Sequence, residues 1–142
     1  MILLDTNVLS ALMLAEPDPV VVRWLDGLDP TSIWTTSVTV FEVRFGLSRR
    51  DAGRKADRLE KAFAALISDD LEGRVATLDH LAAEAAGLLA ARREAAGKTV
   101  DFRDTLIGGI ALANKADIAT RNSRHFTDLD VTVIDPWQGA PV

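Results

Sequence analysis

The chain of 142 residues contains no cysteine and only two histidines, His80 and His125. It can therefore form no disulfide, it offers no thiolate nucleophile, and it cannot hold zinc through sulfur. The two histidines stand far apart in the sequence, which argues against a histidine-based metal site. Any metal must be held by oxygen ligands.

Long apolar runs are also lacking. No run approaches the roughly 20 residues that a membrane-spanning helix needs, and the first five residues have neither the basic start nor the apolar core of a signal peptide. We therefore expect a soluble, cytoplasmic protein. With 48% hydrophobic and 26% charged residues, the composition excludes a disordered chain, and the length fits one domain.

Short apolar or β-branched runs alternate with segments of helical periodicity. The runs predict five strands, at residues 2–4, 33–36, 74–78, 117–120 and 131–134. Helices are predicted between them, among them 19–28, 38–47, 52–67, 102–115 and one that follows Asp79 and turns Leu81, Ala85, Leu88 and Leu89 inward. This alternation predicts an α/β fold with a mainly parallel sheet, in which ligands bind beyond the carboxyl ends of the strands.

Three acidic residues stand where a site at this edge would need them. Asp5 ends the first strand, although capping of the following helix would also explain it. Glu42 lies on a partly apolar helix face, where a carboxylate needs either an arginine or a cation as its partner. Asp104 opens an almost entirely apolar helix, whereas helix capping alone explains Asp101.

Carboxylates that converge repel each other, by roughly 4 kcal/mol per pair at about 4 Å and an effective dielectric near 20. A divalent cation relieves this repulsion. A site with only oxygen ligands favours Mg²⁺ or Mn²⁺, which commonly act on phosphate oxygens. The polar segment that follows the predicted strand 117–120 suits phosphate or water binding, and we interpret His125 in it as a loop histidine rather than a general base. The implied chemistry is metal-assisted hydrolysis of a phosphodiester.

The sequence resembles the PIN-domain family and, within it, the VapC-type ribonuclease toxins of the FitB-like branch. The matching segments are ILLDTNV at 2–8, TVFEVRFG at 39–46, DTLI at 104–107, TRN at 120–122 and IDPW at 134–137. They occur in the family's order over essentially the whole chain. The resemblance implies a single PIN-like domain over residues 1–142, with three α/β/α layers and a roughly five-stranded central sheet.

The resemblance also implies an endoribonuclease in which Asp5, Glu42 and Asp104 hold Mg²⁺ or Mn²⁺. A water activated by the metal would attack an RNA phosphate. Asn122 stands where the family often has a fourth acid; it can orient a water but cannot act as a base, which favours one ion over two. The residues expected to bind substrate are Thr6, Thr120, Arg121, Arg49 and Arg50.

The net charge of −5 is distributed unevenly along the chain. The stretch 44–61 carries seven basic and three acidic residues. A basic helix beside an acidic pocket is expected to hold the RNA backbone, although a solvated helix with ordinary ion pairs would explain the same charges.

The expected partners are an RNA substrate, a VapB-type antitoxin whose C-terminal segment blocks the acidic pocket, and a second copy of the chain. DNA would be contacted only through the antitoxin. Trp24, Trp34, Phe41 and Phe45 are predicted either to line a groove for a partner helix or to belong to the core.

Two other functions remain open from the sequence. The first is a catalytically weak PIN-like binding module that pairs with an antitoxin to contact operator DNA, for which Asn122 is the support. The second is a phosphohydrolase with Asp5 as nucleophile, although such enzymes usually have a second Asp where this chain has Asn7.

Overall fold

The computed structural model describes residues 1–138, and its strands form one sheet in the order β3-β2-β1-β4-β5. The strands are β1 (Ile2–Leu4), β2 (Ile33–Thr36), β3 (Val75–Ala76), β4 (Asp117–Ala119) and β5 (Val133–Ile134). All four pairings are parallel, and Leu3 at the centre lies opposite Trp34 on one side and Ile118 on the other. The parallel five-stranded sheet expected from the sequence is confirmed.

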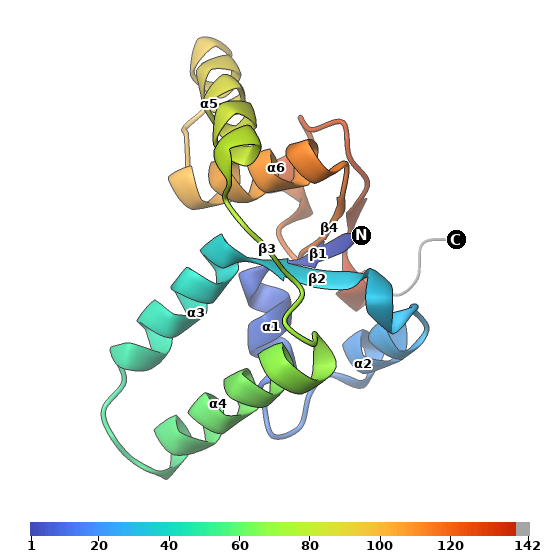
Figure 1. Ribbon diagram of the computed structural model, residues 1–142, viewed down its shortest axis with the longest axis vertical. Helices are drawn as coiled ribbons and strands as arrows, with labels where there is room; N and C mark the ends of the chain where they lie inside the picture. The colour runs from blue at the N-terminus through green and yellow to red at the C-terminus, as the bar shows by residue number, and fades with distance from the viewer. Residues whose placement is uncertain (139–142) are drawn as a thin grey trace.

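Helices cover both faces of this sheet (Figure 1). One layer holds α1 (Thr6–Leu12), α2 (Pro19–Asp26), α3 (Ser37–Ser48) and α4 (Arg54–Ala65), and the other holds α5 (His80–Ala95) and α6 (Phe102–Asn114). Shorter helical turns are η1 (Pro30–Ser32), η2 (Leu66–Asp70), η3 (Ser123–Phe126) and η4 (Pro136–Gln138). The predicted α/β/α layering is therefore confirmed. Over the described residues, no helix has the length and apolar character needed to cross a bilayer.

Successive side chains of β1 point into different cores, as the alternation of a strand requires. Leu4 belongs to the cluster that packs under α1, α2, α3 and α4, whereas Leu3 belongs to the cluster under α5 and α6. Both are 1% exposed. This explains why the strand is a continuous apolar run rather than an alternating one.

Several boundaries differ from the prediction. The strand expected at 74–78 is limited to Val75–Ala76, although the Arg74 carbonyl still accepts the Thr35 N–H of β2. After the strand, the Leu78 N–H donates to the Ser37 hydroxyl instead of to a strand backbone. The strand expected at 131–134 is reduced to β5. The helix expected at 52–67 begins at Arg54 and passes at Leu66 into the wider turn η2.

The prediction for the apolar stripe of α5 was right for Leu89, which is 1% exposed, and wrong for Leu81 and Leu88. Leu81 and Leu88 are 68% and 66% exposed, and the buried residues of this helix are Ala82, Ala86, Leu89 and Arg93. The reason is the close approach of α6. A Cβ placed on Gly109 would lie 2.5 Å from the Cβ of Ala86 and 2.6 Å from the carbonyl oxygen of Ala82, so only small side chains fit between the two helices.

We predict that Gly109→Ala destabilises the fold by about 1–3 kcal/mol, because the added methyl group meets the backbone of α5. Gly87→Ala is the matched control. A Cβ at Gly87 meets nothing within 4 Å, so Gly87→Ala should raise the free energy of unfolding, by at most about 1 kcal/mol, through helix propensity. Urea unfolding of both variants measures the difference, and equal effects would contradict the close packing of α5 on α6.

Candidate active site

The Asp5 carboxylate lies at the carboxyl end of the central strand and is 5% exposed. Its Oδ1 accepts the Thr6 N–H at 2.7 Å and its Oδ2 accepts the Thr120 hydroxyl at 2.8 Å. The Asp5 N–H continues the sheet by donating to the Ala119 carbonyl of β4 at 3.0 Å. Asp5 therefore caps α1, as one of the two sequence-based interpretations required, and also occupies the edge where ligands bind in parallel sheets.

Burial raises the pKa of Asp5 above its ordinary value, and the negative charge of Asp104 raises it further. The hydrogen bonds from Thr120 and Thr6 act in the opposite direction. Asp104 reaches this edge because α6 runs back toward the start of β4, which places the first turn of α6 near the carboxyl end of that strand.

Glu42 projects from the middle of α3, and its side chain is 17% exposed. Burial raises the pKa of Glu42, as do the charges of Asp5 and Asp104. Arg103, whose Nη1 lies 3.6 Å from Glu42 Oε2, partly offsets this. The structure thus brings the three predicted acids to one edge. Of the two partners expected for Glu42, an arginine or a metal cation, the structure shows an arginine, Arg103.

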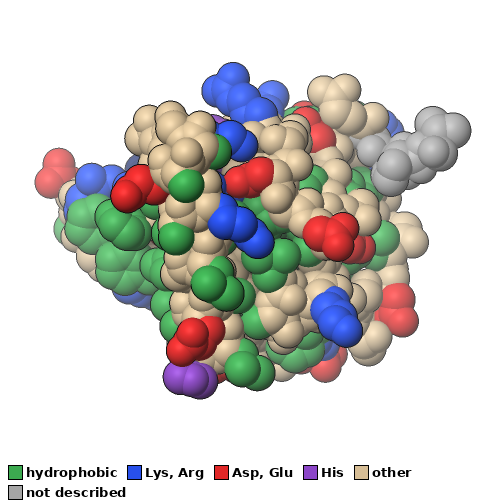
Figure 2. Space-filling model, turned by 90° about the horizontal axis from the view of Figure 1, so that it is seen from above, with side chains coloured by type: hydrophobic (Ala, Val, Ile, Leu, Met, Phe, Trp, Pro, Cys, Tyr) green, Lys and Arg blue, Asp and Glu red, His purple; other side chains and the backbone are tan. Residues whose placement is uncertain are grey.

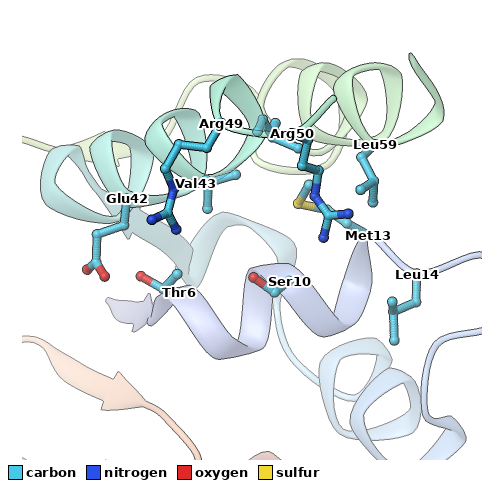
Figure 3. A pocket seen from close by; sticks show the side chains of 11 residues that line it. Thr6, Ser10, Met13, Leu14, Glu42, Val43, Arg49, Arg50 and Leu59 are labelled. Carbon is cyan, nitrogen blue, oxygen red and sulfur yellow. The ribbon is translucent and has the colours of Figure 1, made fainter. Parts of the chain in front are cut away.

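The Thr6 hydroxyl faces the Glu42 carboxylate (Figure 3) and favours its charged form. It is nevertheless buried without a hydrogen-bond partner of ordinary geometry among residues 1–138. A buried hydroxyl in this position costs free energy unless something binds to it.

Asp104 is held by His125, whose Nδ1 lies 2.7 Å from Asp104 Oδ2. The His125 backbone is fixed in turn by Arg93, which is 6% exposed and donates to the His125 carbonyl at 2.8 Å. Arg93 also makes two bonds to Asp128, at 2.8 and 2.9 Å, and one to the Thr105 hydroxyl at 3.1 Å. The hydrogen bonds from Arg93 hold the pKa of Asp128 below its ordinary value.

Thr120 is fully buried and organises the segment after β4. Besides donating to Asp5, its hydroxyl accepts from the Asn122 N–H at 3.0 Å and from Asn7 Nδ2 at 3.3 Å. Asn122 itself is exposed. Arg121 places its guanidinium 4.7 Å from the centroid of the Trp137 ring. Of the residues expected to bind substrate, Thr120 therefore contacts an acid directly, whereas Arg121 is stacked on an aromatic ring.

A groove of about 530 Å³ opens beside Glu42 and Thr6 (Figure 3). Arg49 and Arg50 reach into it from the end of α3, and Met13, Leu14 and Leu59 supply apolar lining. Both predicted substrate arginines therefore share a cavity with Glu42. Part of the basic stretch is neutralised within the fold, because Arg44 pairs with Glu60 at 2.7 Å.

The four aromatic residues considered for a partner groove divide into two pairs. Trp24 is buried in the core under α1 to α4, and Trp34 is half-buried against the other core, under α5 and α6. Phe41 and Phe45 are 62% and 48% exposed, with their rings parallel and 6.1 Å apart on α3. Figure 2 shows hydrophobic side chains gathered at the surface over this helix.

The donor atoms at this edge suit a hard divalent cation, because they are carboxylate oxygens together with the unpaired Thr6 hydroxyl. Within residues 1–138, however, no three acidic or histidine side chains lie close enough to hold one ion together. Asp104 is directed at His125 and Glu42 lies beside Arg103. Sharing an ion would require these two carboxylates to turn from their present partners.

Three residues that shape this site, Arg93, Arg103 and Asp128, were not predicted from the sequence, and neither was the direct contact of His125 with Asp104. A signal for Arg93 was present, because it continues the buried series Ala82, Ala86 and Leu89 at helical spacing. Arg103 precedes Asp104 directly, but nothing in the local sequence indicates that it faces Glu42.

The family profile of the PIN domain matches residues 2–131. The chain belongs to the PIN-domain family. This PIN domain is 34% identical to the VapC ribonuclease Y4jK of Sinorhizobium fredii over 99% of its own length and 100% of that protein. It is 31% identical to the toxin FitB of Neisseria gonorrhoeae, over 96% and 99% of the two chains. The resemblance to VapC-type, FitB-like toxins is confirmed.

Among solved structures, this PIN domain is similar to a chain of FitAcB from Neisseria gonorrhoeae with a TM-score of 0.86 and 31% identity, over 96% of this chain and 99% of that one. A chain in the structure of FitAB bound to the IR36 DNA fragment matches with the same TM-score and identity, over 96% of each chain.

The pKa directions predict opposite stability effects for two variants. Glu42 has a raised pKa, so its contribution to stability is complete below its ordinary value of 4.5 and is lost as pH rises through the folded-state pKa. Glu42→Gln should therefore gain stability over wild type at pH 7, and the gain should shrink as pH falls toward 4.5.

Asp128 has a lowered pKa, so its contribution is present above 3.8 and is lost only as pH falls through the still lower folded-state value. Asp128→Asn should therefore be destabilised at pH 7, by about 1.5–3 kcal/mol for the charged hydrogen bonds that it removes, with the deficit kept down to pH near 4.5. Urea unfolding across this pH range tests both, and parallel curves for the two variants would contradict the assignment.

Proposed function

We propose that this chain is a divalent-metal-dependent endoribonuclease and the toxin of a toxin–antitoxin pair. The observation that carries the proposal is the gathering of Asp5, Glu42 and Asp104 from three elements at one sheet edge, where their mutual repulsion helps to raise the pKa of Asp5 and Glu42. A divalent cation offsets such repulsion. The names of two relatives, a VapC ribonuclease and the toxin FitB, support the same activity.

In this proposal, Asp5 and Asp104 are metal ligands, and Glu42 completes the ligand set or orients a water. Mg²⁺ or Mn²⁺, when bound, supplies an activated water and offsets charge on the phosphate. Thr120 keeps the Asp5 carboxylate in place through its 2.8 Å hydrogen bond, and Asn122 orients a water. Thr6 offers to the same region a hydroxyl that has no hydrogen-bond partner of ordinary geometry within residues 1–138. Arg49 and Arg50 hold the RNA backbone in the groove beside Glu42.

The proposed protein partner is a VapB-type antitoxin. The groove with its apolar lining and its acidic end at Glu42 suits an amphipathic peptide segment that places a basic side chain near the acids. FitAB was solved bound to a DNA fragment, which supports contact with DNA through the antitoxin.

We predict that Asp5→Asn and Asp104→Asn each lower Mg²⁺- or Mn²⁺-dependent RNA cleavage by more than about a hundredfold, since even residues outside the ligand set commonly cost 10- to 100-fold in metal sites. Asp130→Asn, an exposed acid away from the edge, is the matched control and should cleave normally. The assay uses antitoxin-free protein and labelled RNA, with chelator as a second control. Full activity of both site variants would end the nuclease proposal.

The binding-module alternative rests on Asn122 in place of an acid and on the side-chain partners that Asp104 and Glu42 already have, His125 and Arg103. Calorimetric titration with Mg²⁺ and Mn²⁺ separates the two functions. Absence of binding at millimolar metal would favour the module, whereas binding that Asp5→Asn weakens would favour the nuclease.

We also propose a homodimer that covers Phe41 and Phe45, since two stacked, exposed aromatic rings on one helix are costly in water. We expect the double variant Phe41→Ser, Phe45→Ser to shift the mass measured by light scattering from dimer to monomer. Phe102→Ser, which removes another exposed ring on α6, is the control and should leave the dimer intact. A wild-type monomer at high concentration would contradict the dimer.

A further inference from the structure

A second cleft, of about 380 Å³, opens beside Asp104 and His125. The end of α5, the segment 97–101, the start of α6 and the turn η3 form its walls. Its lining includes two exposed cations, Lys98 and Arg124, and the hydroxyl residue Thr99. The groove that contains Arg49 and Arg50 opens beside Glu42 instead. Two acids of the edge, Glu42 and Asp104, therefore each adjoin a cavity whose lining includes exposed cations.

The lining of this cleft carries three cations, Arg93, Lys98 and Arg124, and three acids, Asp101, Asp104 and Asp128. Arg93 and Asp128 neutralise each other through two hydrogen bonds, and His125 is bonded to Asp104. Lys98 is only weakly paired: its Nζ lies 3.9 Å from Asp128 Oδ2, and both oxygens of that carboxylate already accept hydrogen bonds from Arg93.

Arg124 makes no ion pair with any residue between 1 and 138. Asp101 lines the same cleft as Arg124, and its Oδ1 accepts the Asp104 N–H at the start of α6. Asp104 belongs to the acidic edge, where the proposed metal would offset its charge, so away from that edge Lys98 and Arg124 face Asp101 alone and this part of the cleft is suited to an anion.

The backbone that carries Arg124 is fixed. Arg93 binds the carbonyl of the next residue, His125, and binds Asp128 three residues further along. The His125 N–H donates to the Asn122 carbonyl at 3.0 Å, which closes the turn on its other side. Because the turn is already ordered, binding through Arg124 loses less conformational entropy than binding through a flexible loop.

We propose that Lys98 and Arg124 hold a phosphate of the RNA strand next to the one at the acidic edge, while Arg49 and Arg50 hold the strand on the Glu42 side. This inference rests on the proposed ribonuclease function. Three carboxylates in a chain of net charge −5 repel RNA, so productive approach requires cations on the path of the strand. A polyanion with regularly spaced phosphates can occupy the cleft and the edge together, which a single small anion cannot.

The test measures RNA binding in the full chain carrying Asp5→Asn, so that cleavage does not interfere. Into this background we place Lys98→Gln with Arg124→Gln, or the matched control pair Arg92→Gln with Lys115→Gln. The control removes the same charge from exposed residues outside the cleft. The probes are a fluorescein-labelled dodecamer oligoribonucleotide and a dinucleotide, and the readout is fluorescence anisotropy over a salt series.

For the dodecamer, the cleft variant should bind roughly tenfold more weakly. The negative slope of log K against log salt should become shallower by roughly 0.7 for each phosphate that the protein no longer neutralises. The dinucleotide, which has a single phosphodiester and no terminal phosphate, lacks the neighbouring phosphate and should bind the cleft variant and the background alike. The control pair should keep the original slope.

An unchanged slope in the cleft variant, or an equal weakening in the control pair, would overturn the inference. Loss of antitoxin binding with RNA binding retained would also overturn it, since the cleft would then serve a protein partner. Failure of the nuclease proposal is read separately, from absence of metal-dependent cleavage by the wild-type chain. The binding comparison still decides the role of the cleft in that case.

Discussion

The Asp5 carboxylate is buried at the end of the central strand, where water cannot disperse its charge and where Asp104 adds repulsion. Two hydrogen bonds offset part of this cost, because the Thr120 hydroxyl and the Thr6 N–H donate to its two oxygens. The neighbouring acids have partners of their own, the His125 ring beside Asp104 and the Arg103 guanidinium beside Glu42. A parallel sheet provides the setting, because the carboxyl ends of its strands bring distant segments to one edge.

Arg93 links this edge to the rest of the fold. It lies among the small residues by which α5 packs on α6, and it reaches from there to Thr105, Asp128 and the His125 carbonyl. The turn that carries the His125 side chain is therefore held by a residue of α5 as well as by its own hydrogen bond to the Asn122 carbonyl. The same arrangement orders the turn that carries Arg124, so the close α5–α6 contact at Gly109 affects both the acidic edge and the neighbouring cleft.

Much of the fold was predictable because it depends on local patterns. The run Ile2–Leu4 followed by Asp5 predicted a buried strand that passes into a capped helix, and the structure has both. The prediction failed where a tertiary contact overrides a local preference. Leu81 and Leu88 suggested an inward stripe, but the nearness of Gly109 admits only small residues such as Ala82 and Ala86.

The sequence by itself determined which oxygen-bearing residues were available, their order, and the strand end, helix face and helix start on which they lie, because periodicity and capping act over a few residues. Only the tertiary structure decided their partners. That Arg103 faces Glu42, that His125 meets Asp104, and that Arg93 is buried against Asp128 all depend on how helices distant in sequence settle on the sheet. Such pairings follow from distances across the fold, which no short stretch of chain encodes.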